Sequence, residues 1–182
     1  MSSPIRSPDG NWWDNPLAST EKKWLGASII TAVILFGWMF GWMHIGDQNP
    51  TGRTYTTSSA QYRKQVAAYK EKATRTEQGL RPAGRDVYIA GLQFGFDGLP
   101  VVLEAGREYR VHLGSYDVQH GFSVRDEDDL IQQFNLQMLP GYEWVVPMTF
   151  DDPGTYRVVC NEFCGLGHSG MQGKFVVVEG GS

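Results

Sequence analysis

The chain has 182 residues, enough for one domain with a substantial hydrophobic core and an appendage. Its net charge of −4 is unevenly distributed: residues 1–83 carry ten Lys/Arg against six Asp/Glu, whereas residues 84–182 carry six against fourteen. The acidic half lacks the basic footprint of a nucleic-acid-binding protein, which argues against nucleic acid as a partner.

The N-terminal region predicts a tail followed by a membrane anchor. Residues 1–23 are polar and rich in turn formers, which is typical of a tail. Residues 24–45 contain no Asp, Glu, Lys or Arg, and about 20 apolar residues suffice to cross the ~30 Å hydrocarbon core of a bilayer. Trp24, Trp38 and Trp42 lie towards the ends of this stretch, as interfacial anchors do. We therefore predict one uncleaved transmembrane helix, with the lipid bilayer as a partner.

Charge leaves the orientation of this helix open. Lys22 and Lys23 precede the apolar stretch and favour a cytoplasmic N-terminus. Arg53, Arg63 and Lys64 follow within about 20 residues of its other end, and the same rule counts them.

Residues 46–85 are predicted to be a polar connector that contains a helical segment. Within 58–78, Tyr62, Val66 and Tyr69 recur at three- and four-residue steps, which is the period of an amphipathic helix. The basic residues on its other positions fit either a solvated face or a contact with lipid headgroups or a partner.

Residues 86–182 are predicted to form a β-sandwich or barrel. Apolar and polar residues alternate in short runs separated by turn signals, which is typical of antiparallel strands. One run places His112 on its polar side, so we expect a surface histidine there, whereas another begins with His120 on its apolar side. Pro147 predicts that the run from 142 to 150 is an edge strand or is bulged.

The soft metal ligands are concentrated between residues 160 and 171. This stretch holds both cysteines of the chain, one of its four histidines and one of its six methionines. Sulfur donors with imidazole select copper, zinc or iron–sulfur, and a weak thioether favours copper electron transfer. A disulfide between Cys160 and Cys164 would close a very short loop and stabilise the fold little. We therefore interpret both thiols as metal ligands.

Two copper sites can be drawn from these residues. His120, Cys164, His168 and Met171 supply the donors of a mononuclear blue-copper site. Cys160 remains, and two thiolates shared between two copper ions, each with one histidine, would form a binuclear centre. Met171 would then bind one copper and a backbone carbonyl of the loop the other. Spreading a one-electron change over two metals would keep structural reorganisation small, so such a centre would carry electrons rather than make bonds.

The motif Cys160-x-Glu162-x-Cys164-x3-His168-x2-Met171, preceded by His120, resembles the binuclear copper (CuA) motif of cytochrome c oxidase subunit II. The resemblance covers about 24–45 and 86–180, and implies a cupredoxin Greek-key β-sandwich tethered by one N-terminal transmembrane helix. It implies two copper ions, with Glu162 binding through its backbone carbonyl. The implied side-chain ligands are His120, Cys160, Cys164, His168 and Met171.

The resemblance also implies a place in a respiratory complex. A chain of this family accepts electrons from cytochrome c, or a similar donor, and passes them to haem in a catalytic subunit I, where O2 is reduced to water. Further membrane subunits are expected. The copper domain would lie on the periplasmic side of the cell membrane, with the N-terminus in the cytoplasm.

Departures from the common pattern leave alternatives open. A single anchor resembles the B-type oxidases, because the common subunit II has two helices. In the common A-type enzymes the residue matching Glu162 also binds magnesium at the subunit I boundary, so magnesium is a candidate second metal. The same copper domain occurs in nitric oxide reductases, and a membrane-tethered copper chaperone also uses Cys-x3-Cys. The acidic stretch 126–129 is either a solvated hairpin tip or a docking site for a basic cytochrome c. Phe94 and Phe96 lie in a loop that could approach the rim of the copper site, but we interpret them as core residues.

Overall fold

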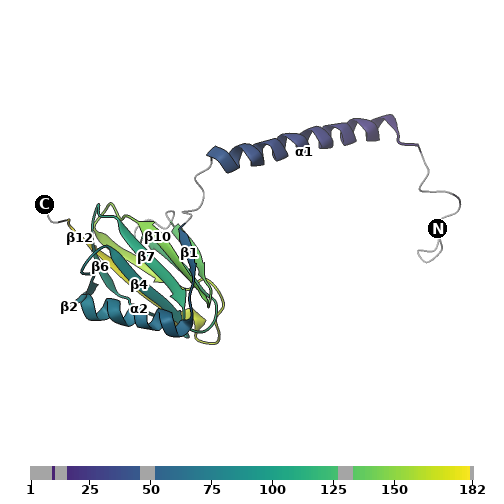
Figure 1. The fold of residues 1–182 in the computed structure, drawn as a ribbon. Coiled ribbons are helices and arrows are strands. Elements are labelled where there is room, and N and C mark those ends of the chain that lie inside the picture. Colours follow the sequence, from purple (N-terminus) through teal and green to yellow (C-terminus); the bar gives the residue numbers. More distant parts are fainter. Residues whose placement is uncertain (1–9, 11–15, 46–51, 127–132, 181–182) are drawn as a thin grey trace. The chain divides into compact units, whose positions relative to one another are not determined.

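The computed structural model describes residues 10, 16–45, 52–126 and 133–180. The chain divides into two compact units, Met1–Asn49 and Pro50–Ser182. The described part of the first unit is mainly the helix α1, Ser19–Ile45 (Figure 1).

Helix α1 has the length and composition of a membrane-spanning helix. Its 27 residues are long and apolar enough to cross a bilayer, and none of them is buried within the protein. At 1.5 Å per residue the helix is about 40 Å long, more than the ~30 Å hydrocarbon core. It begins five residues before the predicted apolar stretch because the Glu21 carboxylate accepts a 2.7 Å hydrogen bond from the Ala18 N–H and so caps the first turn.

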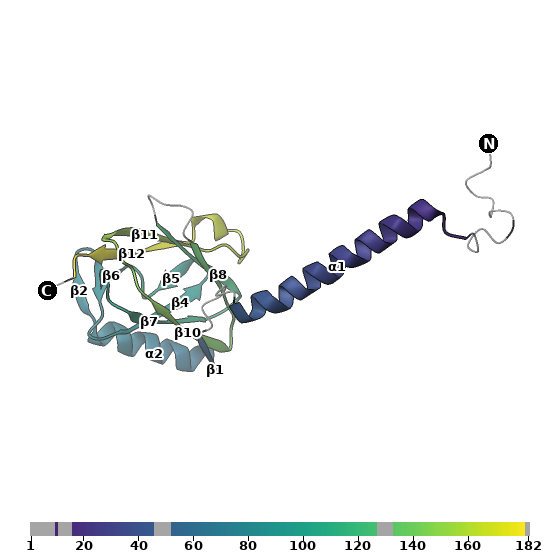
Figure 2. The same cartoon turned by 90° about the horizontal axis from the view of Figure 1, so that it is seen from above.

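The second unit contains two β-sheets, which Figure 2 shows as facing layers. The five-stranded sheet has the order β1 (Arg53–Thr56), β10 (Tyr142–Met148), β7 (Tyr109–Ser115), β4 (Asp86–Leu92) and β5 (Gly95–Asp97). The seven-stranded sheet has the order β2 (Thr74–Thr76), β3 (Gly79–Arg81), β6 (Val101–Glu104), β12 (Gln172–Val178), β11 (Gly154–Val159), β8 (His120–Asp126) and β9 (Gln133–Met138).

The alternating pattern of the strands places the core between the sheets. Strand β7 lies between β4 and β10. Its Val111 and Leu113 are fully buried, whereas its Arg110 is exposed. From the facing sheet, Phe122 packs edge-on against Phe175 with ring centroids 6.3 Å apart. Each large apolar side chain buried in this way contributes about 1.5–3 kcal/mol to folding. The predicted β-sandwich is therefore confirmed.

The strand pairing is less uniform than the sequence predicted. Most neighbouring strands are antiparallel, but β4 pairs with β7, and β6 with both β3 and β12, in parallel. The edge-strand prediction for the run with Pro147 is met only in part: β10 lies between β1 and β7, but β1 pairs only with positions 142–145. Pro147 lies beyond the end of β1, where its missing N–H costs no bond to that strand.

Helix α2, Ser59–Lys72, lies on the outer face of the five-stranded sheet (Figure 2). The Ser58 hydroxyl caps it by accepting a 3.2 Å hydrogen bond from the Gln61 N–H. Tyr62, Val66 and Tyr69 form its buried face, as predicted. The prediction that the helix continues to residue 78 is wrong, because the chain turns at Lys72 into the hairpin of β2 and β3.

The compact domain also takes in much of the segment expected to be a connector. Strand β1 pairs with β10, α2 packs on β4, and β3 pairs with β6 through Leu80 and Val101. These elements look polar in sequence because they bury few side chains: α2 buries one face, β3 buries only Leu80, and all four residues of β1 are exposed. The structure thus draws the domain boundary at Pro50 rather than at residue 86.

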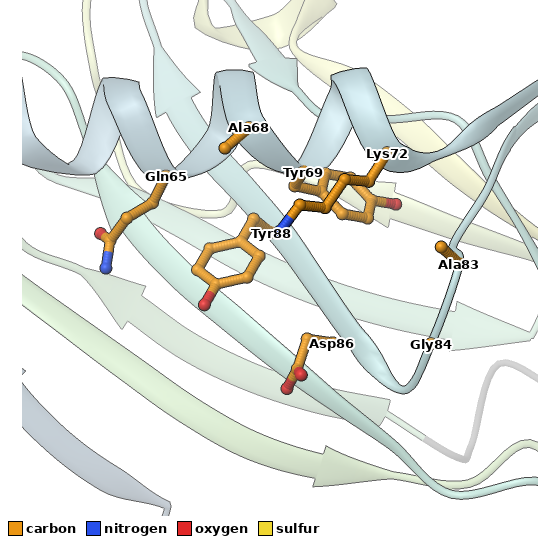
Figure 3. A pocket seen from close by; sticks show the side chains of 8 residues that line it. All are labelled: Gln65, Ala68, Tyr69, Lys72, Ala83, Gly84, Asp86 and Tyr88. Carbon is orange, nitrogen blue, oxygen red and sulfur yellow. The ribbon is translucent and has the colours of Figure 1, made fainter.

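A pocket of about 320 Å³ lies between α2 and β4 (Figure 3). Its Tyr69 hydroxyl and the nearby Gln65 side-chain oxygen have no hydrogen-bond partner among the described residues. Its lining residues are Gln65, Ala68, Tyr69, Lys72, Ala83, Gly84, Asp86 and Tyr88. None of them is a predicted metal ligand.

Candidate metal centre

His120 is the first residue of β8 and is fully buried. Its Nε2 lies 2.8 Å from Oδ1 of Asp117. Its Nδ1 is also buried and has no hydrogen-bond partner among the described residues. A buried imidazole with one nitrogen held by a carboxylate and the other free is the arrangement typical of metal-binding histidines.

Cys160 and Cys164 lie in the loop that joins β11 to β12. Both are buried free thiols, and their Sγ atoms are 3.9 Å apart. The Cys160 N–H donates to the Met171 carbonyl at 3.1 Å, which closes the base of the loop. Burial, reinforced by the neighbouring Cys160 thiol, raises the pKa of Cys164 to about 11. The thiol therefore stays protonated at neutral pH until a metal displaces its proton.

The backbone at Glu162 also faces the thiols. Its carbonyl oxygen lies 3.2 Å from the Cys160 Sγ. Its side chain is held away from the cluster, because Oε1 accepts a 2.8 Å hydrogen bond from Nε2 of Gln137 on β9. The carbonyl and the carboxylate of Glu162 are thus available for different contacts.

His168 and Met171 complete the group. The Cys164 Sγ lies 3.8 Å from Nδ1 of His168 and 3.8 Å from Sδ of Met171. A 3₁₀ turn, His168–Gly170, places His168 over the loop, and the Met171 side chain is 1% exposed. The metal-ligand cluster, as we name it, comprises His120, Cys160, Glu162, Cys164, His168 and Met171.

The structure brings all six sequence-predicted residues to one end of the sandwich. A ring nitrogen of His120 and the sulfurs of Cys160 and Cys164 lie within 4.8 Å of one another. His120 is 40 positions before Cys160 and arrives because β8 pairs with β11. The donor set of thiolates, imidazoles and thioether suits copper by its softness, and the buried His120 Nδ1, which has no partner among the described residues, fits the role of a metal ligand.

Three supporting residues were missed or misassigned by the sequence analysis. The Gln93 side-chain amide donates to the Cys164 carbonyl. Phe94 was interpreted as a core residue, but it is 44% exposed and its ring packs over Gly167 of the ligand loop. Asp117 received no role, although a carboxylate three residues before a candidate ligand histidine could have suggested one. Phe96 does lie in the core, as expected.

His112 does not join the cluster, and its expected place on the surface is wrong. Its side chain is only 12% exposed, because the sheet face that carries it lies under Tyr88 and α2. Its Nδ1 lies 2.6 Å from Oε1 of Glu143, and its Nε2 lies 3.2 Å from Oδ1 of Asp86. The ring stacks on Tyr88 at a centroid distance of 4.0 Å.

Exposed apolar side chains surround the ligand loop. Phe94, Phe163 and Leu166 are 44%, 78% and 101% exposed, and we call them the apolar rim. The ring of Phe163 lies 6.0 Å from that of His168. Of the acidic stretch that was considered for docking, only Asp126 belongs to the described residues.

Comparison with known proteins identifies relatives over most of the chain. No family model matches it. It is 31% identical over 161 residues to cytochrome c oxidase subunit 2 of Thermus thermophilus, an alignment that covers 87% of this chain and 92% of the relative. It is 27% identical over 213 residues to heme-copper oxidase subunit 2 of Aeropyrum pernix, covering 92% and 85%.

A solved structure supports the fold. A chain from a cryo-EM structure of a heme-copper terminal oxidase dimer aligns with a TM-score of 0.50 and 22% identity, over 87% of this chain and 99% of that chain. The likeness extends over nearly all of that chain and supports the fold.

Proposed function

The chain belongs to the cytochrome c oxidase subunit 2 family of the heme-copper oxidases, and on this premise we propose that it carries the binuclear copper centre through which electrons enter the complex. As a subunit 2 it is a component of a cytochrome c oxidase complex that contains a catalytic subunit I. Its own elements are a cupredoxin β-sandwich and an apolar N-terminal helix suited to anchor it in a membrane.

The convergence of the metal-ligand cluster carries the proposal. The two thiols are 3.9 Å apart, and His168 and Met171 approach Cys164 to 3.8 Å each. We assign two copper ions to the side chains of His120, Cys160, Cys164, His168 and Met171 and to the Glu162 carbonyl. Copper bound there would accept and release one electron at a time. The protein would hold these donors in a buried site, so that the change of charge moves few atoms.

The electron partners follow from the same assignment. We propose that cytochrome c, or a similar carrier, delivers electrons at the apolar rim and that haem in subunit I receives them. Exposed aromatic and aliphatic side chains next to His168 favour a contact that excludes water. Further membrane subunits would surround α1.

We propose a cytoplasmic N-terminus and a copper domain on the periplasmic side of the cell membrane. Lys22 and Lys23 at the start of α1 agree with this orientation. Protease added to sealed cells stripped of their outer barrier should digest the sandwich and leave an N-terminal tag protected. Protection of the sandwich would reverse the orientation.

A magnesium ion at Glu162 is a further candidate. Mg²⁺ requires octahedral oxygen coordination, and the described residues offer no second carboxylate grouped with Glu162. The remaining oxygens would have to come from subunit I. Manganese substituted into the intact complex should then give a spectrum that Glu162→Gln changes, and an unchanged spectrum would remove magnesium from this position.

Copper loading of the full chain in detergent tests the binuclear assignment. We expect two coppers per chain and a paramagnetic resonance signal of one electron shared by two copper nuclei. Cys160→Ser should reduce the content to one copper with a localised signal, whereas Ser169→Ala, an exposed neighbour in the same loop, should change neither. One copper per wild-type chain would overturn the proposal.

The assignment as an oxidase subunit can be tested only with the intact complex. Turnover with O2 and reduced cytochrome c is the expected activity, because the relatives are named as oxidase subunits. Turnover with nitric oxide alone would instead support the alternative of a nitric oxide reductase. The β-sandwich argues against a tethered copper chaperone of the thioredoxin-like α/β type.

A further inference from the structure

We propose that Asp117 is a positioning residue that fixes which nitrogen of His120 faces the metal and links His120 to the Cys164 loop. This inference rests on the proposed copper centre, but its first test does not require copper. Asp117 lies in the turn between β7 and β8, three residues before His120.

The Asp117 carboxylate is held by three hydrogen bonds. Oδ1 lies 2.8 Å from Nε2 of His120 and accepts from the Val118 N–H at 2.7 Å. Oδ2 accepts from the Gln93 N–H at 2.8 Å. Both oxygens therefore act as acceptors towards backbone N–H groups, as the oxygens of a carboxylate do.

The Asp117 carboxylate determines the tautomer of His120. A carboxylate can only accept, so the ring proton must reside on Nε2. Nδ1 then carries the lone pair, and this is the nitrogen that is buried without a partner among the described residues. A Cβ on Gly91 would lie 2.7 Å from Cδ2 of the ring, so the β4 backbone closes the other side. The ring has one orientation available.

The same carboxylate reaches the ligand loop through Gln93. The Gln93 backbone donates to Asp117, and its side-chain amide donates to the Cys164 carbonyl. His120 and Cys164 come from different parts of the chain, yet each is one or two hydrogen bonds from Asp117. Loss of Asp117 should therefore loosen two ligands at once.

The negative charge has a second consequence. A carboxylate that accepts from a ligand imidazole makes the imidazole a stronger donor. A stronger donor favours the oxidised, more positive metal over the reduced one. Replacing Asp117 with a neutral residue should therefore raise the reduction potential of the copper-loaded protein.

The first experiment reads the tautomer in the metal-free full chain in detergent. Long-range proton–nitrogen correlation should show His120 with its proton on Nε2 in the wild type, and a mixture of both tautomers in Asp117→Ala. A wild-type ring protonated on Nδ1, or an unchanged tautomer in Asp117→Ala, would overturn the proposal. Neither result depends on whether two coppers, one or none bind, so a failure here is distinct from a failure of the copper assignment.

The second experiment uses copper-loaded protein. Asp117→Asn, which keeps the size but loses the charge, should retain copper and shift the potential to more positive values. Asp117→Ala should show the same shift and lose about 10–100-fold in copper affinity. Asp151→Asn, an exposed site with the same charge change, is the matched control and should change neither. A wild-type potential in Asp117→Asn would contradict the charge effect, and thermal unfolding of the metal-free variants separates these effects from misfolding.

Discussion

The Sγ atoms of Cys160 and Cys164 lie 3.9 Å apart in a buried loop, and both thiols are free. A thiolate at Cys164 would lie in a poorly solvated site beside the sulfur of Cys160, which favours the protonated form of Cys164 in the absence of metal. Burial first, and then Cys160, raises the pKa of Cys164 to about 11.

The metal-free protein should therefore lose stability in alkali. The thiol of an unfolded cysteine has a pKa of about 8.5, and that of Cys164 in the folded protein is higher. The protonated Cys164 thiol therefore makes its full contribution to stability below the unfolded pKa, and this contribution is lost as the pH rises through the folded pKa. The free energy of unfolding should fall by up to about 1.4 kcal/mol per pH unit in this window. Denaturant titrations from pH 8 to 10 should show this slope, and Cys164→Ser should remove most of it. An equal slope in the variant would show that other groups cause the loss.

Gly167 is expected to tolerate no side chain while Phe94 covers it. A Cβ at Gly167 would lie 2.5 Å from Cγ and Cδ2 of Phe94. Gly167→Ala should destabilise the domain by about 1–3 kcal/mol, the usual cost of overpacking, and should weaken copper binding. Unfolding and copper titration both measure the effect.

A double variant tests the cause. If the clash with Phe94 is responsible, Phe94→Ala combined with Gly167→Ala should be less damaging than the sum of the two single changes. Simple additivity would place the damage elsewhere in the loop.

The buried pair of His112 and Glu143 should stabilise the fold without affecting the metal centre. Glu143 is 6% exposed, and its Oε1 lies 2.6 Å from Nδ1 of His112. The contact links β10 to its neighbour β7. Glu143→Ala should cost roughly 3 kcal/mol, because it leaves a buried polar ring without its partner. Glu143→Gln, which keeps an acceptor, should cost about 1 kcal/mol. Glu108→Ala, at an exposed position, is the control variant. A changed copper spectrum in either Glu143 variant would contradict the separation of the two sites.

Acid should weaken the link between β4 and β7 at Asp86 and Arg110. The guanidinium donates two hydrogen bonds, of 2.6 and 2.7 Å, and holds the pKa of Asp86 below its ordinary value. The stabilisation is present above the unfolded pKa, about 3.9, and is lost as pH falls through the lower folded value. Because the pair is exposed to solvent, we expect its contribution to stability to be small.

Melting temperatures test this link. The wild type should exceed Asp86→Asn at pH 7 and approach it near pH 2. A constant difference at both pH values would mean that Asp86 acts through its size rather than its charge.

The sequence by itself determined the features that are local. A 22-residue apolar stretch, 24–45, predicts a spanning helix without any partner. Two thiols, an imidazole and a thioether fall within 160–171, so their chemistry is evident before folding. Alternation in β8 was sufficient to place His120 on the inner face, because strand side chains alternate with a period of two.

Only the tertiary structure decided what surrounds these features. His112 is covered because α2 packs over a sheet face whose polar residues suggested solvent, and Phe94 reaches the ligand loop because β4 and the loop end at the same edge of the sandwich. Asp117 gains its role from hydrogen bonds to Gln93 and His120. Contacts between residues far apart in the chain leave no periodic signal, so they emerge only when the two sheets pack.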